Sequence, residues 1–198
     1  MIKKSIIKAG DKRFFPDLRE LVDYKDLFIT LSMRDIRVRY AQAFLGLLWA
    51  LLQPLVSVVI LYVVFVKFVE VDTGEIPPLL FIACGQALWT YFSFVMSNAG
   101  NSIIASQDMV KKIYFPRLII PLSKATTGLV DFSISLAILI CLMVFYGFAP
   151  KGTFLLSLLF LLIGVIAALS IGIWLSALTI RFRDFQHIIP FMVQLGTY

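Results

Sequence analysis

Five polar residues inside one apolar stretch are spaced so that they share a helical face. The stretch runs from Leu79 to about Ile104 without a charged residue, and its polar residues are Gln86, Thr90, Ser93, Ser97 and Asn101. Four aromatic residues surround this stripe, namely Trp89, Tyr91, Phe92 and Phe94. Aromatic rings stack on the C–H faces of sugars, and hydroxyl and amide groups pair with sugar hydroxyls, so the stripe could bind a glycan. Taken alone, it favours hydrogen bonding between helices, with a Trp/Tyr belt at a membrane surface.

Another apolar stretch, roughly Leu118 to Phe148, contains two charged residues. Lys124, Thr127, Asp131 and Ser135 share one helical face there. Lys124 and Asp131 are two turns apart, about 10 Å along the helix axis, so they are expected to meet through partners or to snorkel rather than to pair directly. A proton relay would need further acids or histidines, and a structural polar clamp is therefore the favoured hypothesis.

The sequence contains no motif for nucleotide chemistry or hydrolysis. No glycine is followed by lysine, which excludes a Walker A loop, and neither G-x-S-x-G nor H-E-x-x-H occurs. One histidine cannot form a multi-histidine metal site, and Cys84 and Cys141 lie in apolar runs, where we expect small core residues. The chain is therefore predicted to be no enzyme and to bind no cofactor itself.

The elements that position these residues are predicted to be helices in a lipid bilayer. Hydrophobic residues make up 60% of the 198 residues and charged residues 15%, and a soluble domain of this size could not bury so much apolar surface. Apolar blocks cover residues 44–66, 79–104, 118–148 and 154–180, and a fifth begins at Ile188 and is cut off at Tyr198. We predict an all-α polytopic membrane protein with four complete transmembrane helices and the start of a fifth.

The fourth block carries small residues at strict intervals of four. They are Gly164, Ala168, Gly172 and Ser176. A ridge of small side chains lets a second helix approach closely, so we expect this face to pack against another span.

Lysines and arginines lie mostly on one side of these spans. Residues 1–43 hold ten, the 105–117 connection three and the 181–187 connection two, whereas the other side has Lys67 and Lys151. This asymmetry predicts a cytoplasmic N-terminus and explains the net charge of +6 without nucleic-acid binding. We therefore predict a cytoplasmic segment, 1–43, and a transmembrane domain, 44–198, which we expect to be incomplete at its C-terminal end.

The cytoplasmic segment carries apolar residues at near-helical spacing from Leu18 to Ile29, with charges between them. This pattern favours an amphipathic helix in the membrane interface over a cytosolic helix packed on a partner. Asp35 and Arg39 have the spacing of an ion pair along a helix. Arg34, Arg37 and Arg39 are expected at anionic lipid headgroups.

Several motifs resemble those of the ABC type-2 permeases that export polysaccharides. They are RDIRVRY over 34–40, LG at 45–46, WA at 49–50, QPL over 53–55, KIYFPRL over 112–118, PLS over 121–123, LVDF over 129–132, WLSA over 174–177, RFRD over 181–184 and IPF over 189–191. The resemblance implies a fold with usually six spans and a homodimer that works with two separate ATPase subunits, on which ATP and Mg²⁺ bind. It also implies export of a lipid-linked polysaccharide, such as O-antigen, capsule or teichoic acid, across the bacterial inner membrane.

In such a permease, the residues expected to line the substrate path are Gln86, Trp89, Thr90, Phe92, Ser93, Ser97 and Asn101. The resemblance also implies that the 106–117 connection couples the permease to the ATPase. Its charged residues are Asp108, Lys111, Lys112 and Arg117, beside the apolar and aromatic Met109, Val110, Ile113, Tyr114 and Phe115, which are expected to be exposed. Such a mixture favours a helix that docks on a partner over a loop held at headgroups, and Pro116 is expected to end that helix.

The three arginines of the RDIRVRY motif could also attract the pyrophosphate of a lipid-linked substrate, because guanidinium groups bind phosphate oxygens in pairs. Two other functions stay open. One is an ABC type-2 exporter of a small lipid or drug, which would share the fold but have a narrow, apolar path. The other is a membrane scaffold subunit without a transport role.

Overall fold

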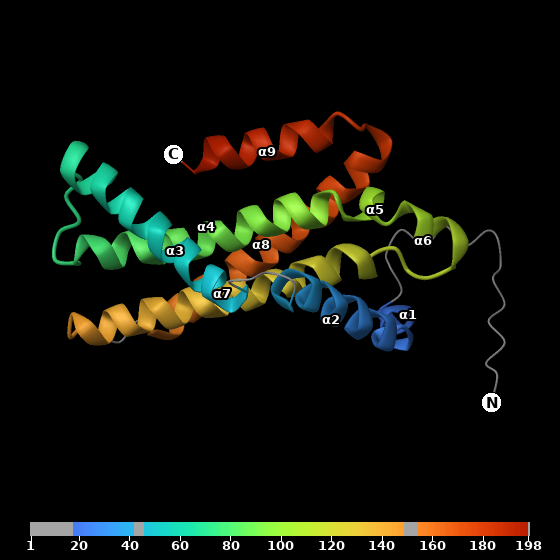
Figure 1. Ribbon diagram of the computed structural model, residues 1–198, viewed down its shortest axis with the longest axis horizontal. Helices are drawn as coiled ribbons and strands as arrows, with labels where there is room; N and C mark the ends of the chain where they lie inside the picture. Colours follow the sequence, from blue (N-terminus) through green and yellow to red (C-terminus); the bar gives the residue numbers. More distant parts are fainter. Residues whose placement is uncertain (1–17, 42–45, 149–153, 198) are drawn as a thin grey trace.

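The structure is a computed structural model that describes residues 18–41, 46–148 and 154–197, and this part of the chain is helical, without strands (Figure 1). The first helices are α1 (Leu18–Asp23), α2 (Lys25–Ala41) and α3 (Gly46–Tyr62), which continues as the π-helix η1 (Val63–Phe68). The long α4 (Pro78–Gly100) is followed by two short helices, α5 (Ser102–Ala105) and α6 (Gln107–Lys112). The chain ends with α7 (Ile119–Phe145), α8 (Phe154–Arg181) and α9 (Phe185–Gly196).

Four helical stretches are long and apolar enough to cross a membrane. They are Leu48–Phe68, Pro78–Gly100, Ile119–Phe145 and Leu159–Arg181. This result confirms the prediction of an all-α polytopic membrane protein. The fifth apolar block forms α9, which turns back from α8 and lies beside α4 (Figure 1).

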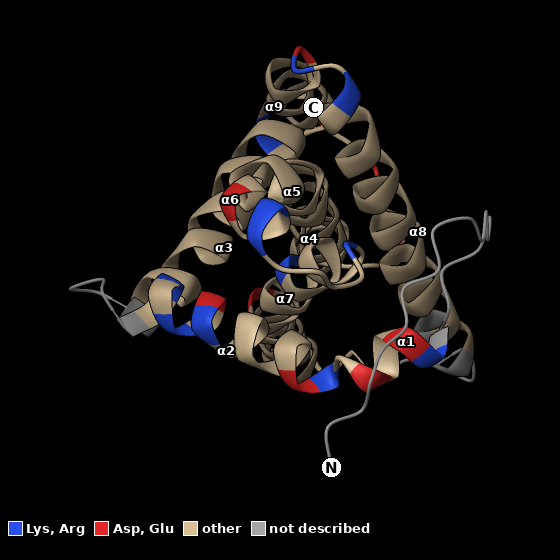
Figure 2. Ribbon diagram, turned by 90° about the vertical axis from the view of Figure 1, so that its right-hand side faces the viewer, with Lys and Arg blue, Asp and Glu red and all other residues tan. Residues whose placement is uncertain are grey.

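Charged residues gather at one end of the bundle, which faces the viewer in Figure 2. This end carries α1, α2, α6 and the turn between α8 and α9, whereas the loop between η1 and α4 lies at the other end. The positive-inside rule would place the charged end in the cytoplasm. The cytoplasmic N-terminus therefore stays a prediction with which the fold agrees.

The central helix of the bundle is α4, which packs against both α7 and α8. On the α8 side, the ridge of small residues brings the two helices close together. A Cβ atom on Gly172 would lie 2.9 Å from Val95 Cγ1, and one on Gly164 would lie 2.7 Å from Leu88 Cδ1. These contacts confirm that the ridge is a packing surface: at Gly172 the neighbours include the Val95 carbonyl oxygen and Ala99 Cβ, and at Gly164 the Leu88 side chain would have to move aside for a Cβ atom.

The N-terminal helix α2 lies along the first half of α7, with α1 at its N-terminal end (Figures 1 and 2). Leu31 and Ser32 are buried, whereas the apolar Ile29 and Met33 are exposed. Exposed apolar residues on α2 suit contact with lipid. The place of α2 in the membrane interface stays a prediction.

The structure corrects the interpretation of the two cysteines. Cys84 and Cys141 are exposed on the outside of the bundle and are not core residues. Each lies in a helix that is apolar on most of its surface, so the sequence does not distinguish the side that faces lipid from the side that faces protein.

Helix α6 also ends earlier than expected. It stops at Lys112, and Ile113 already has extended backbone angles, φ −131° and ψ 137°, so Pro116 is not what ends the helix. The extended segment that follows turns Phe115 into the protein, where it is buried.

Candidate functional site

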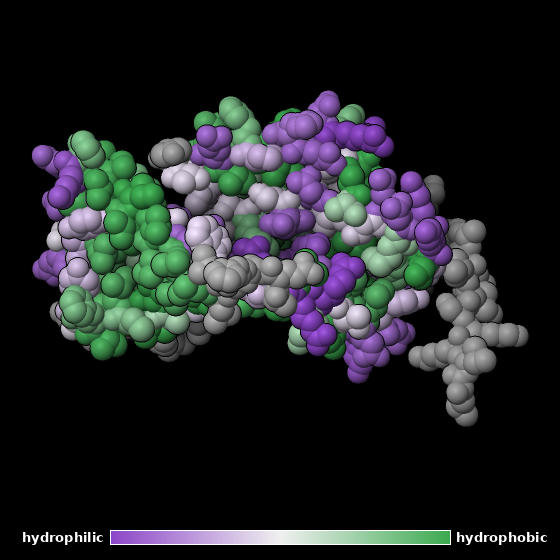
Figure 3. Space-filling model, in the orientation of Figure 1, coloured by the Kyte–Doolittle hydropathy of each residue, from purple (hydrophilic) through white to green (hydrophobic). Residues whose placement is uncertain are grey.

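A hollow of about 300 Å³ opens between α3, α4, α7 and the C-terminal α9. Polar and aromatic side chains from these helices, together with Arg39 of α2, form most of its wall. Figure 3 shows pale and purple residues at the centre of this face, beside the strongly apolar surface of α3. A bundle whose outer surface suits lipid thus keeps a polar recess between its helices.

Five of the predicted path residues of α4 line this hollow. They are Gln86, Trp89, Thr90, Ser93 and Ser97. Phe92 instead packs among core residues and stacks on Trp89, with ring centroids 5.7 Å apart. Asn101 is not in the wall of the hollow, and it follows Gly100, the last residue of α4, one turn beyond Ser97. The role of these residues in a substrate path stays a prediction.

The polar groups of the stripe are satisfied largely within α4 itself. Ser93 Oγ donates to the Trp89 carbonyl at 2.8 Å, and Gln86 Nε2 donates to Thr90 Oγ1 at 3.3 Å. A bond to a different helix is made by Trp89, whose Nε1 donates to Thr197 Oγ1 at 3.1 Å. Bonding between helices therefore explains Trp89 but not Gln86 or Ser93.

Sequence reasoning missed residues that complete the hollow from other helices. Gln53 and Ser57 of α3 and Thr197 after α9 belong to its wall. Gln53 and Ser57 are one turn apart in an uncharged apolar block, the same signal that identified α4. Thr197 carried no such signal, because a single threonine in an apolar helix often donates to a carbonyl of its own backbone. Thr197 itself does so, since its Oγ1 donates to the Val193 carbonyl at 2.9 Å.

Asp131 of α7 binds two neighbouring residues of α2. Tyr40 Oη donates to Asp131 Oδ1 at 2.5 Å, and Arg39 Nη2 lies 2.6 Å from Asp131 Oδ2. Burial and the bond to Asp131 raise the pKa of Tyr40 to about 12, so its phenol remains a hydrogen-bond donor. Because both carboxylate oxygens are engaged, this geometry supports the polar clamp over a proton relay.

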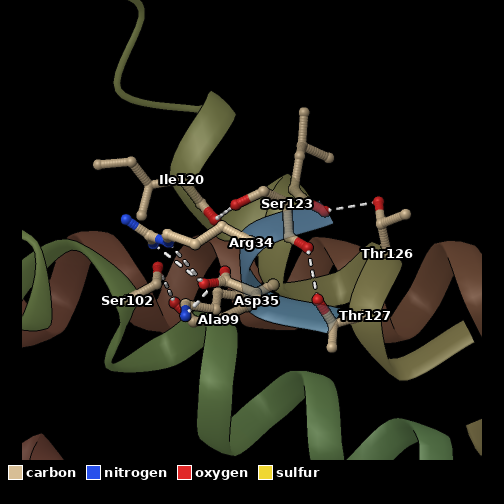
Figure 4. Close-up of polar contacts among 10 residues, drawn as sticks. Arg34, Asp35, Ala99, Ser102, Ile120, Ser123, Thr126 and Thr127 are labelled. Atoms are coloured by element: carbon tan, nitrogen blue, oxygen red, sulfur yellow. Dashed lines mark hydrogen bonds and ion pairs between the residues drawn. The ribbon is translucent and has the colours of Figure 1, made fainter. Parts of the chain in front are cut away.

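A second ion pair joins the same two helices. Lys124 Nζ lies 2.8 Å from Asp35 Oδ2, and Arg34 Nη2 donates to Asp35 Oδ1 at 3.0 Å. Figure 4 shows Arg34 and Asp35 against the helices that carry Ser102 and Ser123. Lys124 and Asp131 therefore meet partners on α2, as expected.

The predicted ion pair between Asp35 and Arg39 is wrong. Asp35 contacts Lys124, and Arg39 contacts Asp131. The two charges of α7 lie in an apolar span, where an unpaired charge is costly, and they therefore take the opposite charges that α2 offers.

The three arginines of α2 have different surroundings. Arg34 pairs with Asp35, and Arg37 is exposed. Arg39 lines the hollow and lies over the Phe94 ring, with its guanidinium carbon 4.6 Å from the ring centroid. Arg39 is thus engaged within the bundle, and the headgroup position of the three arginines stays a prediction.

The 106–117 connection presents a surface of charged, apolar and aromatic side chains at the charged end of the bundle. Its exposed residues include Asp108, Lys111, Lys112, Ile113, Tyr114 and Arg117, whereas Met109 and Val110 are half-buried. Phe115 is only 6% exposed, so the expectation that it lies on the surface is wrong. Tyr114 Oη donates to Glu20 Oε1 of α1 at 3.2 Å, and the charge of Glu20 raises the pKa of Tyr114. The connection is therefore tied to the N-terminal helices.

Across the described residues, no three His, Cys, Asp or Glu side chains are grouped as a metal site requires. The candidate site therefore consists of a polar recess with one ion pair in its wall and of the 106–117 surface at the charged end of the bundle.

Most of this chain is similar in sequence to known proteins. Residues 26–198 match the family described as ABC-2 type transporter. The O-antigen export system permease protein RfbA of Myxococcus xanthus is 30% identical over 178 residues, which cover 90% of this chain and 68% of that protein. Two proteins of the same description from Klebsiella pneumoniae are 31% and 29% identical, each over 87% of this chain and 66% of their own length. The chain spans about two thirds of the length of these relatives.

Proposed function

Because this chain belongs to the ABC-2 type transporter family, we propose that it is the membrane-spanning permease subunit of an ATP-driven exporter of lipid-linked, O-antigen-like polysaccharide. The transport would run from the cytoplasm across the bacterial inner membrane. The observation that carries this proposal is the polar and aromatic hollow beside α4. A bundle that only anchored a complex would have no need to keep polar groups unpacked between apolar spans.

The wall of the hollow suits a sliding sugar chain. Ser93 and Gln86 bond within α4, so they can exchange bonds with passing hydroxyl groups without breaking contacts between helices. Trp89 offers an aromatic face, which stacks on sugar rings without a fixed register. Many weak and exchangeable contacts favour movement over tight binding.

The partners proposed for the permease are a second copy of itself and two ATPase subunits, which would supply ATP and Mg²⁺. The cytoplasmic end offers a surface for the ATPase. Ile113 and Tyr114 are 62% and 57% exposed, and a hollow of about 190 Å³ between α5, α6 and the end of α8 has Lys111, Arg117 and Arg183 in its wall. Exposed apolar and aromatic groups next to cations are typical of a protein interface.

The coupling surface is tested by crosslinking. A photoreactive residue at Ile113 or Tyr114 should crosslink to the ATPase in the assembled exporter, and Tyr114→Ala should uncouple transport from ATP hydrolysis or release the ATPase, with membrane insertion unchanged. Phe115 serves as the matched control position, because its buried side chain should not reach a partner. Crosslinks from Ile113 to lipid alone would contradict the docking assignment.

Arg37 is an exposed arginine of α2 and is proposed to lie at anionic headgroups, where it could also attract the pyrophosphate of the substrate. Vesicle binding and transport with Arg37→Gln test both roles. If both stay unchanged, neither role holds.

The transport path is tested by cysteine accessibility. Cys84 and Cys141 are exposed and are first replaced by alanine. Single cysteines at Gln86, Thr90, Ser93 and Ser97 should then react with water-soluble thiol reagents in the assembled exporter during ATP turnover. A cysteine at the buried Ala87 of α4 is the control that should stay protected. Complete protection of all four positions throughout turnover would contradict a path through the hollow.

The alternative function, export of a small lipid or drug, also has an observation in its favour. A second hollow, of about 250 Å³, lies at the outer end of the bundle and is lined mainly by apolar residues such as Leu61, Phe65 and Ile82. It would suit an acyl chain. Reconstitution with the ATPase distinguishes the functions: a glycan exporter should move lipid-linked polysaccharide, a lipid exporter should move the lipid without its glycan, and a scaffold should move neither.

A further inference from the structure

Building on the proposed function, we propose that the hollow selects uncharged glycan chains over polyanionic ones, and that the Arg39–Asp131 pair sets this preference by keeping the wall electrically neutral. The proposal concerns the chemistry of the chain that passes through the hollow. It assigns Arg39 and Asp131 a part in specificity in addition to joining α2 to α7.

The charge content of the wall is the first observation. Among the described residues that line the hollow, Arg39 and Asp131 are the ones that carry charge, and the others are apolar, aromatic, hydroxyl or amide side chains. The charges neutralise each other across 2.6 Å. A sugar without ionic groups therefore meets hydrogen-bond partners in the wall but no net charge.

The engagement of both charges is the second observation. The carboxylate of Asp131 contacts Arg39 through one oxygen and accepts a bond from Tyr40 through the other. The guanidinium of Arg39 lies between that carboxylate and the ring of Phe94, although 37% of the Arg39 side chain is exposed. Arg39 is thus close enough to the hollow to affect the electrostatic potential there, but the carboxylate of Asp131 already compensates the charge of Arg39.

A polyanionic chain would gain little in such a wall. Phosphate or carboxylate groups entering the bundle would lose water, and no free cation is available among the described wall residues to replace it. Uncharged sugars lose less on leaving water, and the hydroxyl and amide groups of α4 replace their hydrogen bonds. Removal of the Asp131 charge would free the Arg39 guanidinium, which binds carboxylate and phosphate groups well.

The chain supplies its own matched control. Lys124 and Asp35 form a second ion pair between the same two helices, at 2.8 Å, but neither residue lines the hollow. Asp35→Asn therefore disturbs the attachment of α2 to α7 much as Asp131→Asn does, without placing a free charge in the wall. The double variant Arg39→Gln/Asp131→Asn loses the pair but restores a neutral wall.

The first experiment measures the potential of the hollow without any substrate. Ser97→Cys is placed in the exporter that lacks Cys84 and Cys141, and its reaction rates with an anionic and a cationic methanethiosulfonate are compared. We expect the anionic-to-cationic rate ratio to rise about tenfold in Asp131→Asn and to change less than about twofold in Asp35→Asn and in the double variant. An unchanged ratio in Asp131→Asn, or an equal rise in Asp35→Asn, would overturn the proposal.

The second experiment tests specificity with two probes of equal length, the uncharged maltohexaose and the anionic hexagalacturonate. Maltohexaose should slow the labelling of Ser97→Cys at least about threefold more than hexagalacturonate does, and this order should reverse in Asp131→Asn and return in the double variant. If hexagalacturonate slows the labelling of Ser97→Cys as much as maltohexaose does when Arg39 and Asp131 are both present, the proposed selectivity is wrong. A glycan path through the hollow would still be supported. If the wall potential responds as expected but neither sugar protects any variant, the glycan function itself is what fails.

Discussion

The two faces of α4 differ in how closely they pack against neighbouring helices. Toward α8, Val95 and Ala99 pack so closely that Gly172 has no room for a Cβ atom, since such an atom would lie 2.9 Å from Val95 Cγ1 and 3.1 Å from Ala99 Cβ. Toward α3 and α9, Gln86 and Ser93 border an open hollow. One helix thus combines a face that fixes the fold with a face that stays free to bind. This difference predicts two classes of substitution. Those on the packed face should destabilise the bundle, and those on the open face should mainly change what the hollow binds.

The largest effect is expected on the packed face from Gly172→Leu. A leucine side chain would overlap Val95, including its carbonyl oxygen at 3.3 Å from the new Cβ, and should destabilise the bundle by about 3 kcal/mol. Thermal unfolding in detergent measures this loss. Gly85→Leu is the control, because the space beside Gly85 is empty within 4 Å and the substitution should be tolerated. Equal loss in both variants would mean that α8 does not depend on this close approach.

A smaller loss is expected from Thr179→Val on the same interface. Thr179 is fully buried, and its Oγ1 donates to two carbonyls, that of Leu175 in its own helix at 2.5 Å and that of Gly100 at 3.0 Å, the second of which joins α8 to the end of α4. Valine keeps the volume but leaves that carbonyl without the hydroxyl, which should destabilise the bundle by about 1.5 kcal/mol. Thr179→Ser keeps the hydroxyl and should retain most of the stability in the same unfolding assay. The assignment fails if valine is as stable as serine.

On the open face, Thr197→Val should have a modest effect confined to α9. It removes the hydroxyl that accepts the bond from Trp89 Nε1, at a cost of about 0.6 kcal/mol. Hydrogen exchange of the α9 amides should become about threefold faster, while exchange in α8 stays unchanged. Thr197→Ser is the matched control, and faster exchange there would show that the methyl group rather than the hydroxyl holds α9.

The smallest stability effect is expected from Ser93→Ala. The hydroxyl of Ser93 bonds to carbonyls of α4 itself, from Trp89 at 2.8 Å and Thr90 at 3.1 Å, so its loss breaks no contact with another helix. Thermal unfolding should place the variant within about 0.5 kcal/mol of the parent chain, while glycan transport should fall. A large loss of stability would show that this face, too, serves packing, and the contrast between the two faces would disappear.

The spans and the α4 stripe were predictable because lipid imposes simple rules on a sequence. A helix that crosses the membrane needs a long uncharged run, and polar residues within it stand out at helical spacing, as Gln86, Thr90 and Ser93 do. The small-residue ridge of α8 was predictable for a related reason, since a run of small residues at intervals of four has no other evident use in a membrane span.

The remaining features depend on how each helix is rotated against its neighbours. Cys84 and Phe115 were assigned to the wrong environment because the apolar character of a residue does not say whether lipid, protein or solvent surrounds it. The partner of Asp131 was not predictable either, because Arg39 had an equally good local partner in Asp35. The tertiary fold decided between them, since a charge within a span needs compensation more than one on an exposed helix does.

The backbone bonds made by the polar side chains of α4 have a consequence for biosynthesis. Ser93, Asn98 and Asn101 donate to carbonyls three or four residues earlier in the chain, so α4 can leave the insertion machinery for lipid with much of its polarity already satisfied. The following span, α7, contains Lys124 and Asp131, which are compensated by Asp35 and Arg39. Because the ribosome makes α2 first, these two partners are already present when α7 emerges. The order of the helices in the chain thus matches the order in which membrane insertion needs them.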